Sequence, residues 1–234
     1  GCLVLPGLVD LHVHLDDEVG GVPIADGFAA GTEAAVRGGV TTVCAFVTQR
    51  SGEGLGEAVG RMAARAAGAC HGDVALHLTP TGDDWDWGTI ADLVAAGLGT
   101  VKLYTTYRSA GLDTGYDRLE AAMGRLARLG LGLLVHSEDE ETLAAAAGAD
   151  VDPGDARGHG RLRPPLAEVR AVDRVLSAAA RTGCRTHVVH VSTPEAAGLV
   201  AAARNAGAPV SCETGPQYLL LDERSLAPPD GHRN

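Results

Sequence analysis

Aromatic residues and positive charge are both scarce in this 234-residue chain. Phe, Trp and Tyr together make up 3% of it, and 19 basic residues stand against 30 acidic ones, for a formal charge of −11. An acidic chain without a basic stripe binds nucleic acid poorly, because phosphate contacts supply most of that affinity. No apolar run reaches the roughly 20 residues that a membrane span needs. We therefore expect neither nucleic acid nor a membrane as a partner.

Paired cysteines and a secretion signal are also missing. The five cysteines are scattered, odd in number and without a CxxC pair: Cys2, Cys44, Cys70, Cys184 and Cys212. This pattern indicates reduced thiols rather than a disulfide frame. The first residues contain neither the basic segment nor the cleavage site of a signal peptide. We expect a cytoplasmic protein.

Short apolar runs alternate with longer alanine-rich stretches along the chain. With 45% hydrophobic residues, the chain is too apolar to be disordered. The pattern predicts strands over residues 8–14, 40–47, 74–78, 100–104, 131–136 and 186–191, and a seventh from residue 209. It predicts helices over residues 27–37, 55–67, 89–96, 117–129, 138–147, 165–181 and 194–206, with a loop over 148–163.

Seven strand–helix alternations without an antiparallel hairpin signal predict a parallel α/β sheet. Two architectures fit: an open doubly wound sheet and a (β/α)8 TIM barrel. The sequence contains neither a GxGxxG opening a helix after the first strand nor a GxxxxGK[ST] segment. The nucleotide-binding interpretation of an open sheet therefore lacks its main support.

Histidines fall where the predicted strands end. Asp10, His12 and His14 alternate along the first strand and therefore share one face of the sheet, while Leu11 and Val13 point to the other. Two imidazoles on one face of a strand end can chelate one divalent ion. Taken alone, this HxH pair is a weak signal, and two polar strand-end histidines that hold no metal are the simpler interpretation.

Three further residues of this kind occupy equivalent places. Lys102 lies in the fourth predicted strand, His136 ends the fifth, and His190 lies near the end of the sixth. In parallel α/β folds the carboxyl ends of the strands form the active face. Packing alone does not explain this distribution, so the five residues together predict a metal site.

Lys102 is flanked by Val101 and Leu103, and burial in a strand disfavours its charged form. A neutral amine can react with carbon dioxide to give a carbamate, which is a carboxylate on a long arm and can bridge two metal ions. The alternative is an ordinary lysine that reaches solvent or pairs with an acid.

The segment PGLVDLHVH, residues 6–14, resembles the signature of the cyclic amidohydrolases, a group that includes dihydroorotase, allantoinase and D-hydantoinase or dihydropyrimidinase. The resemblance extends over essentially the whole chain. It implies a (β/α)8 barrel whose two metal ions are held by His12, His14, carbamylated Lys102, His136 and His190, together with an Asp. Zinc is the ion we expect for these ligand types, which do not exclude Mn, Fe or Co.

Finer features favour the hydantoinase and dihydropyrimidinase branch. Tyr107 follows Lys102 by five residues, as does the branch's tyrosine that binds substrate and stabilises the oxyanion. Residues 213–219, ETGPQYL, resemble that branch's ETCPQYL, and Gln217 stands where dihydroorotases and allantoinases more often have His. Residues 158–165 with Glu168 also fit. Gly215 in place of a common Cys, and Ala45 where an Asp often stands, leave the exact substrate open.

The other polar candidates have simpler explanations. His77 fits the family pattern as a structural residue, and His187 lies on the strand face opposite His190, which indicates packing. We expect solvated side chains at His71, His159 and His232. The acidic loop over residues 83–87 lacks ligand spacing and is interpreted as a solvated loop with two anchoring indoles.

The pattern contains seven strands, whereas a closed barrel needs eight. In the resembling enzymes an Asp that is both metal ligand and general base ends the eighth strand, and we assign that role to neither Asp222 nor Asp230. We therefore interpret residues 1–234 as one amidohydrolase-type barrel truncated at both ends, without the family's small β-sandwich. Such a chain is expected to be inactive, or nearly so, by itself.

The resemblance implies a metal-dependent hydrolase that opens a hydantoin or dihydropyrimidine ring with a metal-activated hydroxide. The intact enzyme is expected to be a homo-oligomer, a tetramer by resemblance, with a small cyclic amide as substrate. Allantoinase or dihydroorotase activity is the alternative within the family. A non-catalytic dihydropyrimidinase-related scaffold would have lost metal ligands, whereas all five are present here. A mononuclear deaminase would not need Lys102.

Overall fold

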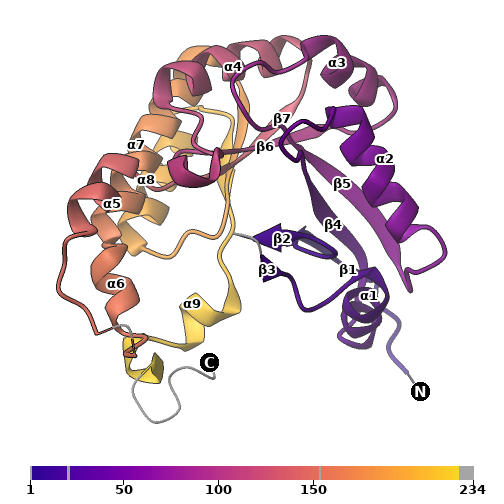
Figure 1. Cartoon of the computed structure of the whole chain (residues 1–234), viewed down its shortest axis with the longest axis horizontal. Helices are drawn as coiled ribbons and strands as arrows, with labels where there is room; N and C mark the ends of the chain where they lie inside the picture. The colour runs from indigo at the N-terminus through magenta and orange to yellow at the C-terminus, as the bar shows by residue number, and fades with distance from the viewer. Residues whose placement is uncertain (1, 20–21, 153, 227–234) are drawn as a thin grey trace. The chain divides into compact units, whose positions relative to one another are not determined.

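The computed structural model describes residues 2–19, 22–152 and 154–226. The chain forms two compact units, Gly1–Lys102 and Leu103–Asn234, each of which is described by itself. Strand β6 (Thr100–Tyr104) begins in the first unit and ends in the second. Figure 1 labels the helices and strands along the chain.

The first unit is a parallel sheet covered by helices. Its elements are β1 (Leu8–Val13), β2 (Glu18–Val19), β3 (Val22–Pro23), α1 (Phe28–Arg37), β4 (Val40–Thr48), α2 (Leu55–Ala66), β5 (Asp73–Thr79), α3 (Trp87–Ala95) and the start of β6. The parallel strands lie in the order β1, β4, β5, β6. The register is fixed by pairs such as Asp10 with Val43 and Phe46 with His77.

Alternation along β4 separates the hydrophobic core of this unit from a polar face. Val43, Ala45 and Val47 point to the helix-covered side, where they belong to a buried cluster with Leu15, Phe28, Ala58 and Met62. Helix α2 lies beside β4 and β5 (Figure 1). Because strand side chains alternate between faces, Phe46 points to the other side. The residues of the candidate site lie on this second face of the sheet.

The second unit also alternates strands and helices. Its elements are η1 (Arg108–Ala110), α4 (Tyr116–Arg128), β7 (Gly132–His136), α5 (Glu140–Ala146), α6 (Gly158–Leu162), α7 (Pro165–Thr182), β8 (Arg185–Val188), α8 (Pro194–Asn205), β9 (Val210–Cys212), α9 (Pro216–Leu220) and η2 (Glu223–Leu226). Strands β7, β8 and β9 are parallel neighbours.

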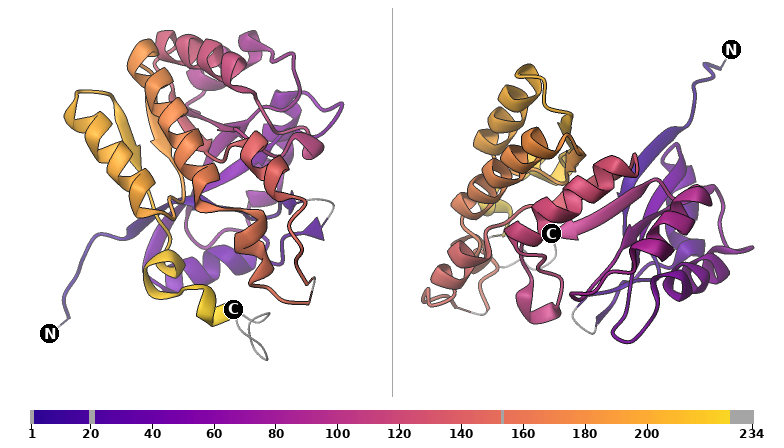
Figure 2. Two further views of the ribbon diagram at one scale, coloured as in Figure 1. Left: turned by 90° about the vertical axis from the view of Figure 1, so that its left-hand side faces the viewer. Right: turned by 90° about the horizontal axis from the view of Figure 1, so that it is seen from above.

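Helix α7 is the central helix of the second unit. It packs against α4 and against α8, which runs beside it (Figure 2). Its buried stripe recurs at helical spacing through Ala171, Val172 and Val175, all 0% exposed. A proline at the first helical position starts it, and Gly183, with φ 69°, ends it in the left-handed conformation that glycine adopts at little cost.

The predicted parallel α/β pattern is confirmed, with three corrections. Strands β2 and β3 pair antiparallel, although no hairpin was expected. Helix α6 lies inside the predicted loop over 148–163. Strand β8 ends at Val188, so His190 lies beyond the strand rather than near its end.

Two expectations concern membranes and cysteine pairing. Within the described part of the chain, no helix combines the length and apolar character that crossing a membrane requires. The five cysteines are free thiols. Asp222 precedes η2 and pairs with Arg224, whereas Asp230 and His232 lie outside the described residues.

Candidate functional site

Three of the predicted ligands in the first unit gather around one aromatic ring. The ring centroids of His12 and His14 lie 4.7 and 4.8 Å from that of Phe46, and the Lys102 Nζ lies 5.2 Å from it. Phe46 and Lys102 are each 1% exposed. Strands β1, β4 and β6, with His14 one residue past the end of β1, therefore bring two imidazoles and a buried amine to the same face.

His14 is oriented by a neighbouring carboxylate. Its Nδ1 lies 3.4 Å from Asp17 Oδ2, which also accepts a hydrogen bond from the Thr48 hydroxyl at 3.3 Å. Burial raises the pKa of Asp17, but these hydrogen bonds and one from the Glu18 N–H outweigh it and hold the pKa below its usual value. An imidazole that donates from Nδ1 presents Nε2 as its ligand atom, the arrangement common at metal-binding histidines.

His77 has the structural role predicted for it. Its Nδ1 pairs with the Thr100 hydroxyl, and its Nε2 lies 3.0 Å from the Leu11 carbonyl oxygen. The side chain is 6% exposed. Both ring nitrogens are engaged with β1 and β6, so His77 fixes these strands rather than offering a ligand atom.

The second unit brings together His136 and His190. His136 Nδ1 lies 3.0 Å from His190 Nε2, and the ring centroids are 4.6 Å apart. Two imidazole nitrogens bound to one tetrahedral zinc lie about 3.4 Å apart, given Zn–N distances near 2.1 Å. The pair therefore fits a shared divalent ion with only a small adjustment.

Glu138 and Arg163 surround His136. Glu138 Oε2 lies 2.6 Å from His136 Nε2, and Arg163 contacts both oxygens of Glu138, with Nε 3.0 Å from Oε1. Burial raises the pKa of Glu138, but the hydrogen bonds from His136 and Arg163 outweigh it and set the pKa to about 2. The ionised carboxylate favours the proton on Nε2 and leaves the Nδ1 lone pair directed at His190.

Tyr107 lies beside these groups in a constrained conformation. Its φ of 67° is left-handed, which is costly for a residue other than glycine and marks a position held by its surroundings. Its ring centroid is 4.9 Å from that of His136 and 5.0 Å from the Arg163 guanidinium carbon. Burial raises the pKa of Tyr107 despite the opposing effect of Arg163. The phenol therefore remains a hydrogen-bond donor.

The predicted ligands thus occur as two groups, one in each unit. His12 and His14 accompany Lys102 in the first, and His136 accompanies His190 in the second. Among the residues that the structure describes, no three His, Cys, Asp or Glu side chains form a metal cluster by themselves.

Sequence reasoning missed the residues that orient the ligands. Phe46 looked like an ordinary core residue, and Asp17 and Glu138 were not singled out. The sequence does place both carboxylates close to a predicted ligand: Asp17 follows His14 by three residues, and Glu138 follows His136 by two. The Arg163–Glu138 pair joins residues 25 positions apart and needs the fold to be seen.

The remaining candidates take structural roles. His187 lies 2.8 Å from the Ser211 hydroxyl and pairs with Glu213. His71 and His159 are exposed. In the acidic loop over 83–87, Asp86 caps α3 by accepting hydrogen bonds from the Gly88 and Thr89 N–H groups.

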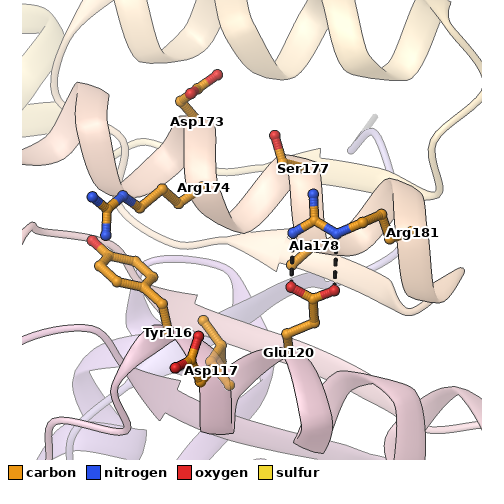
Figure 3. A pocket seen from close by; sticks show the side chains of 9 residues that line it. Tyr116, Asp117, Glu120, Asp173, Arg174, Ser177, Ala178 and Arg181 are labelled. Atoms are coloured by element: carbon orange, nitrogen blue, oxygen red, sulfur yellow. Dashed lines mark hydrogen bonds and ion pairs between the residues drawn. The ribbon is translucent and has the colours of Figure 1, made fainter.

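A hollow of about 280 Å³ lies between α4 and α7 and contains none of the predicted site residues (Figure 3). Arg181 makes two hydrogen bonds to Glu120, at 2.8 and 2.7 Å, and the Arg174 guanidinium lies 4.4 Å from the Tyr116 ring centroid. These groups satisfy one another across the two helices. We interpret the hollow as a gap in the packing between α4 and α7 rather than as a ligand site.

Comparison with known proteins places this geometry in a family. The profile of the Amidohydrolase family matches residues 3–212. A D-hydantoinase of Streptomyces coelicolor is 36% identical over 98% of this chain, and an allantoinase of Rubrobacter xylanophilus is 35% identical over 95% of it. The chain covers 50% and 49% of these two proteins, so it spans about half the length of the curated relatives it matches.

Solved structures show the same relationship. A D-hydantoinase from a Bacillus species has a TM-score of 0.89 and 32% identity, over 97% of this chain and 50% of that one. A dihydropyrimidinase from Brevibacillus agri has a TM-score of 0.87 and 31% identity, over the same shares. The predicted α/β class of the TIM-barrel type is thereby confirmed. On this evidence the chain belongs to the amidohydrolase family.

Proposed function

We propose that the protein containing this chain hydrolyses the C–N bond of a cyclic amide and opens a hydantoin or dihydropyrimidine ring. The observation that carries the proposal is the pair of imidazole nitrogens, His136 Nδ1 and His190 Nε2, aimed at each other 3.0 Å apart next to a protonated tyrosine. The D-hydantoinase and dihydropyrimidinase relatives support the same reaction class.

The ligand types fit two divalent ions, most simply zinc. In this proposal His12 and His14 would hold one ion, His136 and His190 would hold another, and a carbamate formed on Lys102 would supply a further oxygen ligand. When bound, the ions would lower the pKa of water to near neutrality and polarise the carbonyl of the scissile amide. Lys102 is 1% exposed, and such burial favours the neutral amine that carbamate formation needs.

Tyr107 would bind the substrate carbonyl and stabilise its developing negative charge. Its hydroxyl is a donor, and its ring is fixed by His136 and Arg163. A preorganised donor stabilises the charge of the transition state more than that of the ground state.

The charge balance beside Tyr107 favours a neutral ring as substrate. Arg163, the cation over the tyrosine ring, is already paired with Glu138. A carboxylated ring such as dihydroorotate would have to compete with Glu138 for this guanidinium. Allantoinase is the second candidate, because a relative of that name is 35% identical to this chain.

The test is a substrate panel on the zinc-loaded, full-length gene product. We expect turnover of hydantoin and dihydrouracil to exceed that of allantoin and dihydroorotate. Preference for allantoin would establish the second candidate, and absence of turnover of all four rings would favour the non-catalytic scaffold.

We further propose that residues 1–234 form only part of the catalytic barrel. Four strands of the first unit and three of the second give seven parallel strands among the described residues, and the resembling enzymes carry an Asp ligand on an eighth. The chain alone is therefore expected to turn over dihydrouracil far more slowly than the full-length protein. Equal rates would contradict this.

The free thiols support a cytoplasmic location for the protein. We also expect the intact protein to be a homo-oligomer, which light scattering can measure.

Replacing Glu138 with Gln should weaken metal binding about 10- to 100-fold. The change removes the charge that orients His136 and leaves Arg163 without a charged partner. The measurement is a Co²⁺ titration of metal-free protein. Glu140→Gln is a matched control, because Glu140 accepts a hydrogen bond from the Thr106 hydroxyl. Equal affinities for the two variants would show that Glu138 does not orient the ligand.

A further inference from the structure

His190 is held in a backbone conformation that residues other than glycine seldom adopt. It lies two residues after the end of β8 and has a φ of 40°. A residue with a side chain seldom occupies this region, and persists there only when the surrounding structure fixes it. The position of its imidazole therefore depends on what anchors the segment over residues 189–193.

Backbone hydrogen bonds anchor the two neighbours of His190. The Val189 N–H donates to the Val135 carbonyl at 3.2 Å, and the Val191 N–H donates to the Glu213 carbonyl at 2.7 Å. These bonds tie the segment to the chain just before His136 and just after β9. They leave the following residues, Ser192 and Thr193, to be fixed by something else.

One carboxylate fixes both. Glu168, in the first turn of α7, accepts hydrogen bonds from the Ser192 N–H at 3.0 Å and its hydroxyl at 2.7 Å, and from the Thr193 N–H at 2.9 Å and its hydroxyl at 2.6 Å. The Thr193 hydroxyl oxygen in turn accepts from the Ala196 N–H at 3.2 Å and caps α8. Glu168 thus joins α7 to the segment that follows His190.

The same turn of α7 also holds the segment that follows His136. The Asp139 N–H donates to the Ala167 carbonyl at 2.9 Å, and Arg163, two residues before the helix, binds Glu138. Two ligand-bearing segments that are distant in sequence are therefore fixed to one short stretch of chain. We call Arg163, Ala167 and Glu168 the α7 clamp.

We propose that the α7 clamp sets the spacing between His136 and His190, and that Glu168 is a positioning residue for the metal ion these histidines would share. The inference rests on the proposed function for the identity of the ligand pair. Glu168 acts through the backbone, since its partners are the N–H and hydroxyl groups of Ser192 and Thr193. An outer partner of this kind contributes by keeping the ligand atoms in place.

The experiment compares metal binding by full-length, metal-free wild-type protein and its Glu168→Gln variant, with Co²⁺ as the probe. A Gln amide keeps one acceptor oxygen but presents an NH2 group to donors that need an acceptor. The His190→Ala variant identifies which Co²⁺-binding step depends on His190. We expect the Co²⁺ affinity of that step to fall about tenfold in Glu168→Gln, and the Co²⁺ absorption spectrum to change. Wild-type affinity and spectrum in this variant would overturn the proposal.

Asp86→Asn is the control for a loss of stability alone. Asp86 accepts hydrogen bonds from the Gly88 and Thr89 N–H groups and the Thr89 hydroxyl at the start of α3, a comparable set at a helix without a proposed ligand. Matching affinity losses in Asp86→Asn and Glu168→Gln would contradict a positioning role. Where Glu168→Gln does not fold, Ser192→Ala removes a single donor and should weaken the same step severalfold, and unchanged binding would refute the clamp.

The experiments distinguish failure of the α7 clamp from failure of the proposed function. Weakened Co²⁺ binding in Glu168→Gln, in a protein that opens none of the rings, would retain the clamp and reject the reaction. Ring opening by a wild-type protein whose Glu168→Gln variant binds Co²⁺ normally would retain the reaction and reject the clamp. A wild-type protein without a divalent-ion site at His190 would reject both.

Discussion

Replacing Lys102 with alanine should reduce the number of bound zinc ions per chain of the full-length protein from two to one. Lys102 is the only lysine among the 19 basic residues of these 234, the other 18 being arginines. It is also 1% exposed, with its Nζ 5.2 Å from the Phe46 ring centroid. A guanidinium cannot form the bridging carbamate, so arginine would not serve at this position, although it serves as the cation elsewhere in the chain.

The loss of the bridge should also lower turnover at least about a hundredfold, since Lewis-acid assistance supplies several kcal/mol. Metal content is measured by atomic emission after gel filtration. Lys102→Met is the control for packing, because its unbranched side chain fills the space beside Phe46 but cannot be carbamylated. Both variants should lose the same ion. Two ions per chain in either variant would contradict the role of Lys102 in holding the second ion.

A single buried lysine also permits a direct test of the carbamate. Protein equilibrated with ¹³C-bicarbonate should show a carbamate carbon resonance that is absent from Lys102→Met. A spectrum identical in the two proteins would leave Lys102 as an ordinary buried amine.

Much of the fold follows from local patterns, and the exceptions have physical reasons. Apolar periodicity located the strands and long helices because each buries one face or stripe. Helices α6 and α9 have five residues each, too few for a periodic pattern to be recognised. The run Val188, Val189 and Val191 favours a strand, so nothing local indicates that β8 ends before His190. That end is imposed by Glu168 and by backbone bonds to β7 and Glu213.

The candidate site shows the same division. The placement of the histidines and Lys102 at or near strand ends could be predicted, because strand ends share one edge of a parallel sheet. The side chains that orient them could not, since the Glu138–Arg163 and Glu168–Ser192 contacts join residues more than 20 positions apart. Tyr107 was predicted by resemblance alone, and its left-handed backbone and its contact with Arg163 require the structure.

Replacing Tyr107 with Phe should lower kcat of the full-length enzyme about 10²- to 10³-fold, the range expected for the loss of one oxyanion donor. KM should change little, because the interaction strengthens mainly in the transition state. The variant removes only the hydroxyl. The ring contacts with His136, at 4.9 Å between centroids, and with the Arg163 guanidinium, at 5.0 Å, remain available to Phe.

Tyr104→Phe is the matched control, since the Tyr104 ring also lies beside His136, with centroids 5.6 Å apart. It should retain kcat within a few-fold of wild type, and both variants should bind two zinc ions. Steady-state kinetics on dihydrouracil separate the outcomes. A Tyr107→Phe enzyme with wild-type kcat would remove Tyr107 from the reaction. Equal losses in both variants would contradict a role that is specific to the Tyr107 hydroxyl.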